Sequence, residues 1–298
     1  MASTFQVICS RTSETQSHDA AIRDAVQAIE SVAATCSRFD PMSDLVTLNS
    51  SNGLTKVTMT LLDVLAEALD AHHRTDGRFD PRVIEDLERL GYDRSFAEGI
   101  SPMKFPESRS PLSDLRIDVD FEAGTADLHG DRIDLGGIAK GFAVDRAADA
   151  LDWHGVSGLV DLGGDGRVTG PEAQGTPWMI GVEDPFGGVE PLAVFSLDRG
   201  AYATSSTKVR TWDAGGKRVH HLIDSRTGLP GGEGLMALSV ISETTTRAEV
   251  DAKVAFLMGR DEVRSHVERK GIAAMWVDDK GSVECSEQFE RHLVWRRP

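Results

Sequence analysis

The apolar residues of this chain recur every three or four positions in several long stretches, a spacing that is typical of helices. Ser17 is expected to cap the first helix through its hydroxyl oxygen. Gly77 and Gly155 are expected to end two others, because glycine readily adopts the left-handed conformation after a helix. The predicted helices cover residues 17–36, 60–74, 138–153, 245–258 and 261–270.

Short apolar runs between these helices predict strands. Residues 97–114 hold three prolines and four serines, and this composition predicts a long loop. Strands in clusters, with helices grouped between them, favour an α+β fold over a regular βαβ repeat. The predicted strands cover residues 5–9, 115–121, 125–128, 131–135, 158–162, 178–183, 193–197, 219–223 and 235–242, and a final hairpin pairs 272–277 with 282–286.

Composition and charge narrow the class of protein. With 298 residues, 40% of them hydrophobic, the chain can bury a sizeable core, which excludes intrinsic disorder. We expect one domain over residues 1–298, built from two closely packed lobes. The net charge of −16 repels polyanions and argues against nucleic-acid binding. The three cysteines lack metal-ligand spacing, which is typical of free thiols in a reducing compartment. The sequence shows neither a signal sequence nor a long apolar run. We therefore expect a cytoplasmic protein without a membrane span.

The segment Asp134-Leu-Gly-Gly-Ile-Ala-Lys-Gly-Phe-Ala-Val-Asp145 is the strongest candidate for chemistry. A glycine pair followed at once by a helix, with Lys140 in its first turn, could hold a phosphate through backbone amides and the ammonium. A plain tight turn that binds no phosphate would explain the same residue pattern equally well. A second Asp-Leu-Gly-Gly segment begins at Asp161, and on its own it is more typical of a turn.

Three further stretches carry polar groups with ordinary alternative explanations. Residues 203–210 combine hydroxyls with two cations, which suits phosphoryl oxygens but is also typical of a solvated strand end. Of His220 and His221, only one can face a given site if both lie in a strand, so a two-histidine metal site is not expected. Glu249 and Lys253 lie four residues apart, as in an ordinary helical ion pair.

Taken in order, these stretches resemble the ApbE family, the FAD:protein FMN transferases. The segment at Asp134 is similar to the family's Asp-Leu-Gly-Gly-Ile-Ala-Lys-Gly-Tyr-Ala-Val-Asp, and Gly77-Arg-Phe-Asp-Pro81 to its Gly-x-Phe-Asp-Pro. Seven segments in register make a chance similarity untenable. They are Ser37–Asn49, Asp76–Pro81, Asp134–Asp145, Gly163–Asp165, Pro177–Pro185, Ala203–Ser205 and His221–Gly228.

The resemblance implies an α+β fold of two lobes with the flavin in the cleft between them. Such proteins bind FAD, use a divalent cation, usually Mg²⁺, and move the FMN part onto a Thr or Ser hydroxyl of a target flavoprotein with release of AMP. Some members instead hydrolyse FAD to FMN and AMP, and some mainly hold flavin. Transfer is the function we expect, with hydrolysis and flavin carriage or flavin-dependent redox chemistry as alternatives.

The resemblance also implies site residues. His221 would act as the general base for the acceptor hydroxyl, Lys140 would be a further catalytic residue, and Asp224 would hold the loop that carries His221. The residues expected to bind the cofactor are Ser43, Asn49, Asp80, Gly137, Ala139, Lys140, Gly163, Gly164, Asp165, Thr204, Ser205 and Lys253.

The chain departs from the family at the metal ligands. Family members carry Asp and, four residues later, Thr, which bind the metal together with the backbone carbonyl at the position of Ala139. An ungapped register from Gly259 puts Glu249 and Lys253 at the two side-chain positions, whereas a register shifted by two would make Asp251 the carboxylate. Glutamate can bind Mg²⁺, but a charged lysine cannot. The resemblance therefore leaves metal dependence in doubt, with Lys253 replacing part of the metal's electrostatic role.

Overall fold

The computed structural model of the chain describes residues 4–10, 15–101, 105–208 and 210–297. Backbone contacts divide these residues into two compact units. Of the described residues, unit 1 contains those within 31–139 and 210–232, and unit 2 contains those within 4–30, 140–208 and 233–297. Helix α1 (Thr15–Cys36) and helix α5 (Ala139–Trp153) each run across a boundary between the units.

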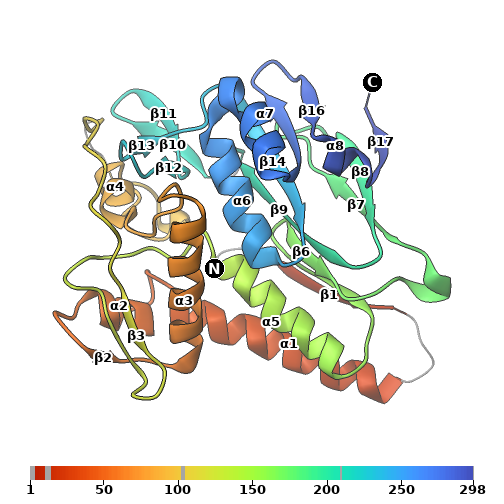
Figure 1. The fold of residues 1–298 in the computed structure, drawn as a ribbon, viewed down its shortest axis with the longest axis horizontal. Coiled ribbons are helices and arrows are strands. Elements are labelled where there is room, and N and C mark those ends of the chain that lie inside the picture. Colours follow the sequence, from red (N-terminus) through yellow and green to blue (C-terminus); the bar gives the residue numbers. More distant parts are fainter. Residues whose placement is uncertain (1–3, 11–14, 102–104, 209, 298) are drawn as a thin grey trace. The chain divides into compact units, whose positions relative to one another are not determined.

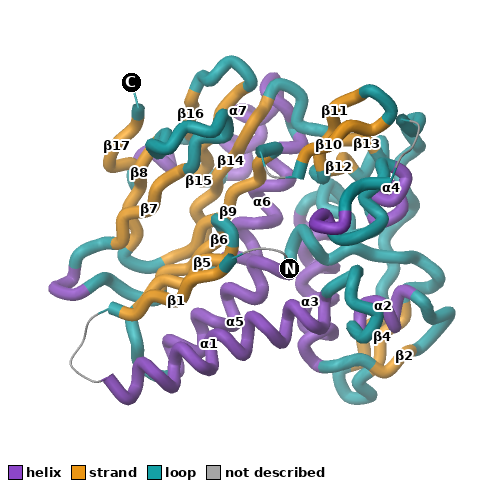
Figure 2. The backbone as a smooth tube through the Cα atoms, turned by 180° about the vertical axis from the view of Figure 1, so that it is seen from behind, coloured by secondary structure: helices purple, strands orange, loops and turns teal. Residues whose placement is uncertain are grey.

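Unit 2 is built on an antiparallel sheet of seven strands in the order β1-β5-β6-β9-β14-β15-β16. Helix α6 (Thr245–Leu257) packs across β9 and β14, and Figures 1 and 2 show α5 and α6 on the same face of this sheet. The strands are β1 (Phe5–Cys9), β5 (Gly158–Leu162), β6 (Asp165–Val168), β9 (Gly200–Ser206), β14 (Leu235–Ser242), β15 (Ala273–Asp278) and β16 (Val283–Cys285).

A second, three-stranded sheet in unit 2 has the order β17-β8-β7. Phe195 of β8 and Tyr202 of β9 stack edge to face with ring centroids 5.6 Å apart, so the two sheets share one apolar core. The remaining elements of this unit are β7 (Trp178–Val182), β8 (Ala193–Leu197), α7 (Gly259–Lys270), α8 (Glu287–Glu290), β17 (Leu293–Arg296) and a 3₁₀ turn (Ala173–Gly175).

Unit 1 combines short helices with small sheets. Its aromatic core places Tyr92 against both Phe96 and Trp212, and the Trp212 indole N–H donates to the Leu90 carbonyl at 2.7 Å. The elements are α2 (Asp44–Asn49), β2 (Thr55–Lys56), α3 (Met59–Arg74), α4 (Ile84–Arg89), a 3₁₀ turn (Phe96–Glu98), β3 (Asp118–Asp120), β4 (Thr125–Asp127), β10 (Thr211–Ala214), β11 (Lys217–His220), β12 (Ile223–Asp224) and β13 (Leu229–Pro230).

The predicted α+β class is confirmed, and each of the five predicted helices is present. Gly77 and Gly155 follow α3 and α5 with φ of 73° and 67°, as expected for glycines that end helices. The assignment of Ser17 as an N-cap is wrong, because α1 already includes Thr15. The predicted strand at 131–135 is also wrong, and the predicted strand at 219–223 is divided between β11 and β12.

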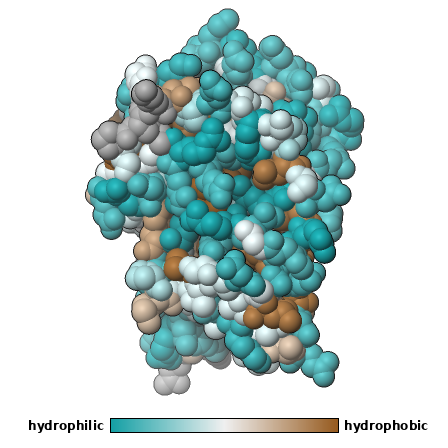
Figure 3. Space-filling model, turned by 90° about the vertical axis from the view of Figure 1, so that its left-hand side faces the viewer, coloured by the Kyte–Doolittle hydropathy of each residue, from teal (hydrophilic) through white to brown (hydrophobic). Residues whose placement is uncertain are grey.

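The predicted loop has no helix or strand among its described residues beyond the 3₁₀ turn at its start. No helix in the described ranges is long and apolar enough to cross a membrane. On the face shown in Figure 3, hydrophobic residues form small separate groups among hydrophilic ones.

Candidate functional site

Lys140 lies at the N-terminus of α5 between two carboxylates of unit 2. Its ammonium contacts the Asp165 carboxylate and lies 3.2 Å from Oε1 of Glu249. The next residue, Gly141, donates its backbone N–H to Oε2 of Glu249 at 2.8 Å. Asp165 and Glu249 are only 1% and 6% exposed. The Lys140 ammonium therefore compensates buried negative charge at the positive end of a long helix.

Strand pairing brings the hydroxyl-rich strand to the same cluster. The Thr204 N–H donates to Oδ1 of Asp165 at 3.0 Å, and the Thr204 hydroxyl lies 2.8 Å from that of Ser239. Ser205 is the next residue of β9 and is buried. Helices α5 and α6 and strands β6 and β9 thus bring Lys140, Glu249, Asp165 and Thr204 together.

Asp145, to which the sequence assigned no role, fixes α6 against α5. Its carboxylate accepts the backbone N–H groups of Thr245 and Thr246, each at 2.8 Å, and the Thr246 hydroxyl at 2.6 Å. These are the first donors of α6, which the helix itself cannot satisfy. Asp145 therefore sets where α6 begins, and with it the position of Glu249 one turn later.

The two glycines Gly163 and Gly164 connect β5 to β6 in a tight turn. Their φ values are 64° and 92°, the left-handed region in which glycine has no steric cost. Asp165 follows this turn directly and is the first residue of β6. Gly137 is buried in the turn that leads into α5 at Ala139.

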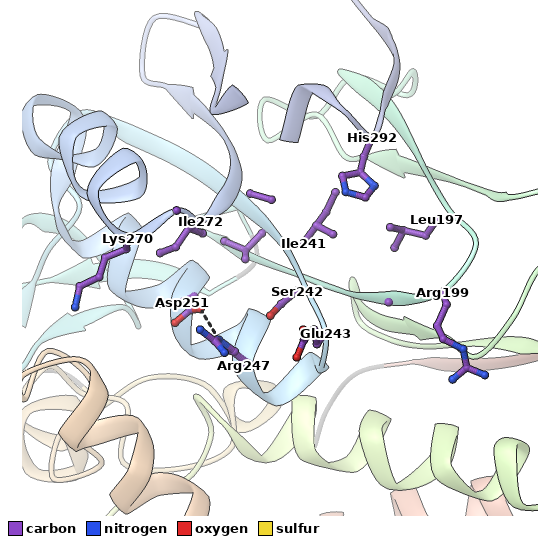
Figure 4. A pocket seen from close by; sticks show the side chains of 14 residues that line it. Leu197, Arg199, Ile241, Ser242, Glu243, Arg247, Asp251, Lys270, Ile272 and His292 are labelled. Carbon is purple, nitrogen blue, oxygen red and sulfur yellow. Dashed lines mark ion pairs between the residues drawn. The ribbon is translucent and has the colours of Figure 1, made fainter. Parts of the chain in front are cut away.

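Asp251 belongs to a different part of unit 2. A pocket of about 520 Å³ lies where β14, α6 and the end of α7 meet, and Figure 4 shows Asp251 in its wall. There the Arg247 Nε lies 3.6 Å from the Asp251 carboxylate. Residues 249 and 251 face opposite sides of a helix, so Glu249 rather than Asp251 adjoins Lys140. This placement supports the ungapped register, in which Lys253 follows Glu249 by one turn on the same face.

In unit 1, Asn49 and Arg38 hold the segment that precedes α5. The Asn49 side-chain amide exchanges two hydrogen bonds with the backbone of Ile133, both at 2.9 Å. Arg38 pairs with Asp134 at 2.6 Å, and its guanidinium lies over the rings of Phe39 and Tyr92 at 4.1 and 4.6 Å. The sequence assigned no role to Arg38, although it lies within the matched segment beginning at Ser37.

Two other expected cofactor residues of unit 1 make internal contacts. The Ser43 hydroxyl caps α2 by accepting the Val46 N–H at 3.1 Å, and it donates to the Ser37 carbonyl at 2.6 Å. Asp80 is buried and pairs with Arg82 at 2.7 Å. Contact of Ser43 and Asp80 with a cofactor stays a prediction.

The turn that follows His221 is tied down at several points. Asp224 accepts the Arg226 N–H at 2.9 Å and its guanidinium at 2.6 Å. Burial alone would raise the pKa of Asp224, but the hydrogen bonds and charge of Arg226 outweigh it and lower that pKa. Ser225 donates its hydroxyl to the Gly77 carbonyl at 2.9 Å. His221 lies just after β11, so the strand alternation expected for His220 and His221 does not apply.

The lowered pKa of the neighbouring His220 leads us to expect that the stability of the protein depends on pH. Burial lowers the pKa of His220 from 6.5 to about 4. Between these values the unfolded chain binds a proton that the folded chain does not, so stability falls as pH falls from 6.5 to 4, by about 3 kcal/mol in all. We expect His220→Asn to flatten this part of the profile in urea unfolding, and His73→Asn, an exposed control, to leave it unchanged. An unaltered slope in His220→Asn would contradict the assignment.

Fold and site together define an α+β protein with a polar site built around the N-terminus of one long helix. A sequence model described as the ApbE family matches residues 1–276, and the chain belongs to this family.

Relatives and solved structures agree with this assignment. The chain is 29% identical to the FAD:protein FMN transferase of Treponema pallidum, over 82% of this chain and 73% of that one. It is 27% identical to that of Salmonella typhimurium, over 85% and 76%. The crystal structure of the ApbE protein from Thermotoga maritima matches with a TM-score of 0.82 at 27% identity, over 99% and 96% of the chains. The flavin transferase ApbE from Vibrio cholerae has the same fold, with a TM-score of 0.75 at 22% identity.

Proposed function

We propose that this protein binds FAD and transfers its FMN part to a Thr or Ser hydroxyl of a target flavoprotein. The observation that carries the proposal is the Lys140 ammonium at the start of α5, in a chain whose relatives are named FAD:protein FMN transferases. A cation at the positive end of a helix suits the bridging phosphates of a dinucleotide.

The proposed reaction is a phosphoryl transfer. The acceptor hydroxyl oxygen forms a bond to the FMN-side phosphorus, and the bond from that phosphorus to the bridging oxygen breaks. His221 takes the hydroxyl proton as general base, and AMP leaves with the bridging oxygen. Lys140 stabilises the charge that develops on the phosphoryl oxygens. Thr204, Ser205 and the Gly163–Asp165 turn would line the nucleotide.

The donor set of this chain does not fit a tightly held Mg²⁺. Glu249 offers a carboxylate, but its two oxygens already face the Gly141 N–H and the Lys140 ammonium. Position 253 supplies an ammonium in place of a hydroxyl. Among the residues that the structure describes, no group of three or more His, Cys, Asp and Glu could hold a metal ion. We therefore propose that Lys253 supplies part of the positive charge and that dependence on Mg²⁺ is weak.

The transfer is tested with FAD, Mg²⁺ and a flavin-free acceptor flavoprotein. A fluorescent acceptor band on a denaturing gel, with AMP released in equal amount, is the expected result. AMP and FMN released without acceptor would instead indicate hydrolysis. FAD that stays intact in the presence of a genuine acceptor would indicate a flavin carrier, and either outcome would overturn the proposal.

Lys253→Thr tests the role assigned to Lys253. We expect wild-type protein to bind FAD almost equally with Mg²⁺ and with EDTA, and Lys253→Thr to bind it about tenfold more weakly in EDTA, because one nearby positive charge is lost. Flavin fluorescence measures the binding, and the transfer rate is followed in parallel. Arg247→Thr removes a cation from the opposite face of α6 and serves as the control. Unchanged affinity and unchanged Mg²⁺ dependence in Lys253→Thr would refute the assignment.

A further inference from the structure

Arg109, from the proline- and serine-rich loop, joins three segments of unit 1. Its Nε donates to the Asp86 carboxylate of α4 at 3.0 Å, and one of its terminal nitrogens donates to the same carboxylate at 2.6 Å. Its other terminal nitrogen donates to the Ser225 carbonyl at 2.8 Å. Its backbone N–H donates to the Thr227 carbonyl, also at 2.8 Å. The guanidinium therefore connects the loop and α4 to the turn that follows His221.

Both sides of this contact are closely packed. Asp86 is 3% exposed, so its charge is held by its arginine partners rather than by water. Gly228 has φ of 68°, and a Cβ there would lie 2.5 Å from the Asp86 carboxylate and 2.9 Å from the Arg109 side chain. Only glycine allows the turn to approach the ion pair so closely.

The same turn is anchored on a second side. The Ser225 hydroxyl donates to the Gly77 carbonyl, and the Ser225 carbonyl accepts from Arg109. The peptide groups between His221 and Gly228 thus have two independent attachments to the rest of unit 1. One comes from the loop that follows α3 and the other from the loop at residues 97–114.

We infer that Arg109 is a positioning residue for His221. By fixing the turn at Ser225 and Thr227, it holds the histidine in the place where it accepts the proton of the acceptor hydroxyl. This inference rests on the proposed function. It gives the loop at 97–114 a role in the reaction through one arginine, without direct contact of Arg109 with the substrate.

Arg109→Lys separates positioning from charge compensation. Lysine keeps the positive charge beside Asp86, but its single ammonium cannot reach Asp86 and the Ser225 carbonyl together as the planar guanidinium does. We expect a folded protein with wild-type FAD affinity and a kcat for FMN transfer that is lower by about tenfold or more, because a charge-assisted hydrogen bond is lost. The double variant Asp86→Asn/Arg109→Gln removes both charges and should show the same loss of kcat.

Arg94→Gln is the matched control, because Arg94 forms an exposed pair with Asp93 near the start of the same loop. It should leave kcat and FAD affinity unchanged. Thermal unfolding and flavin fluorescence establish folding and binding in each variant. A wild-type kcat in Arg109→Lys would show that Arg109 only neutralises Asp86 and would overturn the inference. A wild-type protein that binds FAD but transfers no FMN would instead overturn the proposed function and, with it, this role.

Discussion

Replacing Lys140 with methionine is expected to slow FMN transfer by about 100- to 1000-fold, the usual effect of losing a group that stabilises charge in a transition state. Methionine keeps most of the volume and apolar length of the lysine side chain but carries no charge. The expected loss lies in kcat measured at saturating FAD, which single-turnover assays with excess enzyme would determine. A kcat within about threefold of wild type would remove Lys140 from the proposed chemistry.

The same substitution is expected to lower the free energy of unfolding by about 3–5 kcal/mol, the cost of leaving a buried carboxylate without its partner. Asp165 and Glu249 would then both lose their contact with the Lys140 ammonium. Lys208→Met is the control, because Lys208 pairs with the exposed Glu183 in the same unit. An exposed pair contributes about 1 kcal/mol or less. Equal losses in the two variants would show that the Lys140 cluster adds nothing beyond a surface pair.

Elements with a long, regular apolar period could be predicted from the sequence. The spacing of three and four residues located α1 and α3, because burial of one helix face imposes that period over several turns. The family motifs then indicated which residues the fold gathers around Lys140.

The strand predicted at 131–135 shows why short elements could not be predicted. Its alternation of apolar and polar residues is real, since Ile133 and Leu135 are buried. However, the backbone of Ile133 bonds to the side chain of Asn49, and the N–H of Asp134 bonds to the Pro81 carbonyl. These partners take the hydrogen bonds that a neighbouring strand would make, and nothing within five residues reveals them.

Long-range polar contacts account for the residues that sequence reasoning missed. Asp145 stands inside a matched motif, which marks it as a candidate, but its partners Thr245 and Thr246 lie about 100 residues further on. Arg109 lies in a stretch without any motif, and its role depends on Asp86 and Ser225 together. A local sequence pattern reveals the period of a helix, but it does not reveal contacts between residues that are far apart in the sequence.

Gly141→Ala is expected to destabilise the protein strongly, although helix propensity alone predicts the opposite. Alanine favours a helix interior over glycine by about 1 kcal/mol. A Cβ on Gly141 would lie 2.6 Å from the Thr245 carbonyl oxygen and 2.7 Å from the Thr246 nitrogen, both backbone atoms at the start of α6. Asp145 accepts the N–H groups of Thr245 and Thr246, so a shift of this backbone would strain those hydrogen bonds. We expect a net loss of about 3 kcal/mol or more, comparable to overpacking a core.

The displacement of α6 should also reach the site, because the Gly141 N–H and the Lys140 ammonium both contact Glu249. Gly141→Ala is therefore expected to weaken FAD binding as well as stability, measured by urea unfolding and by flavin fluorescence at a temperature where the variant is folded. Gly181→Ala is the control, since a Cβ there meets only side-chain carbons of Pro191, at 3.4 and 3.9 Å. A gain in stability for Gly141→Ala would mean that α5 and α6 do not pack backbone to backbone, and the placement of Glu249 beside Lys140 would lose its main support.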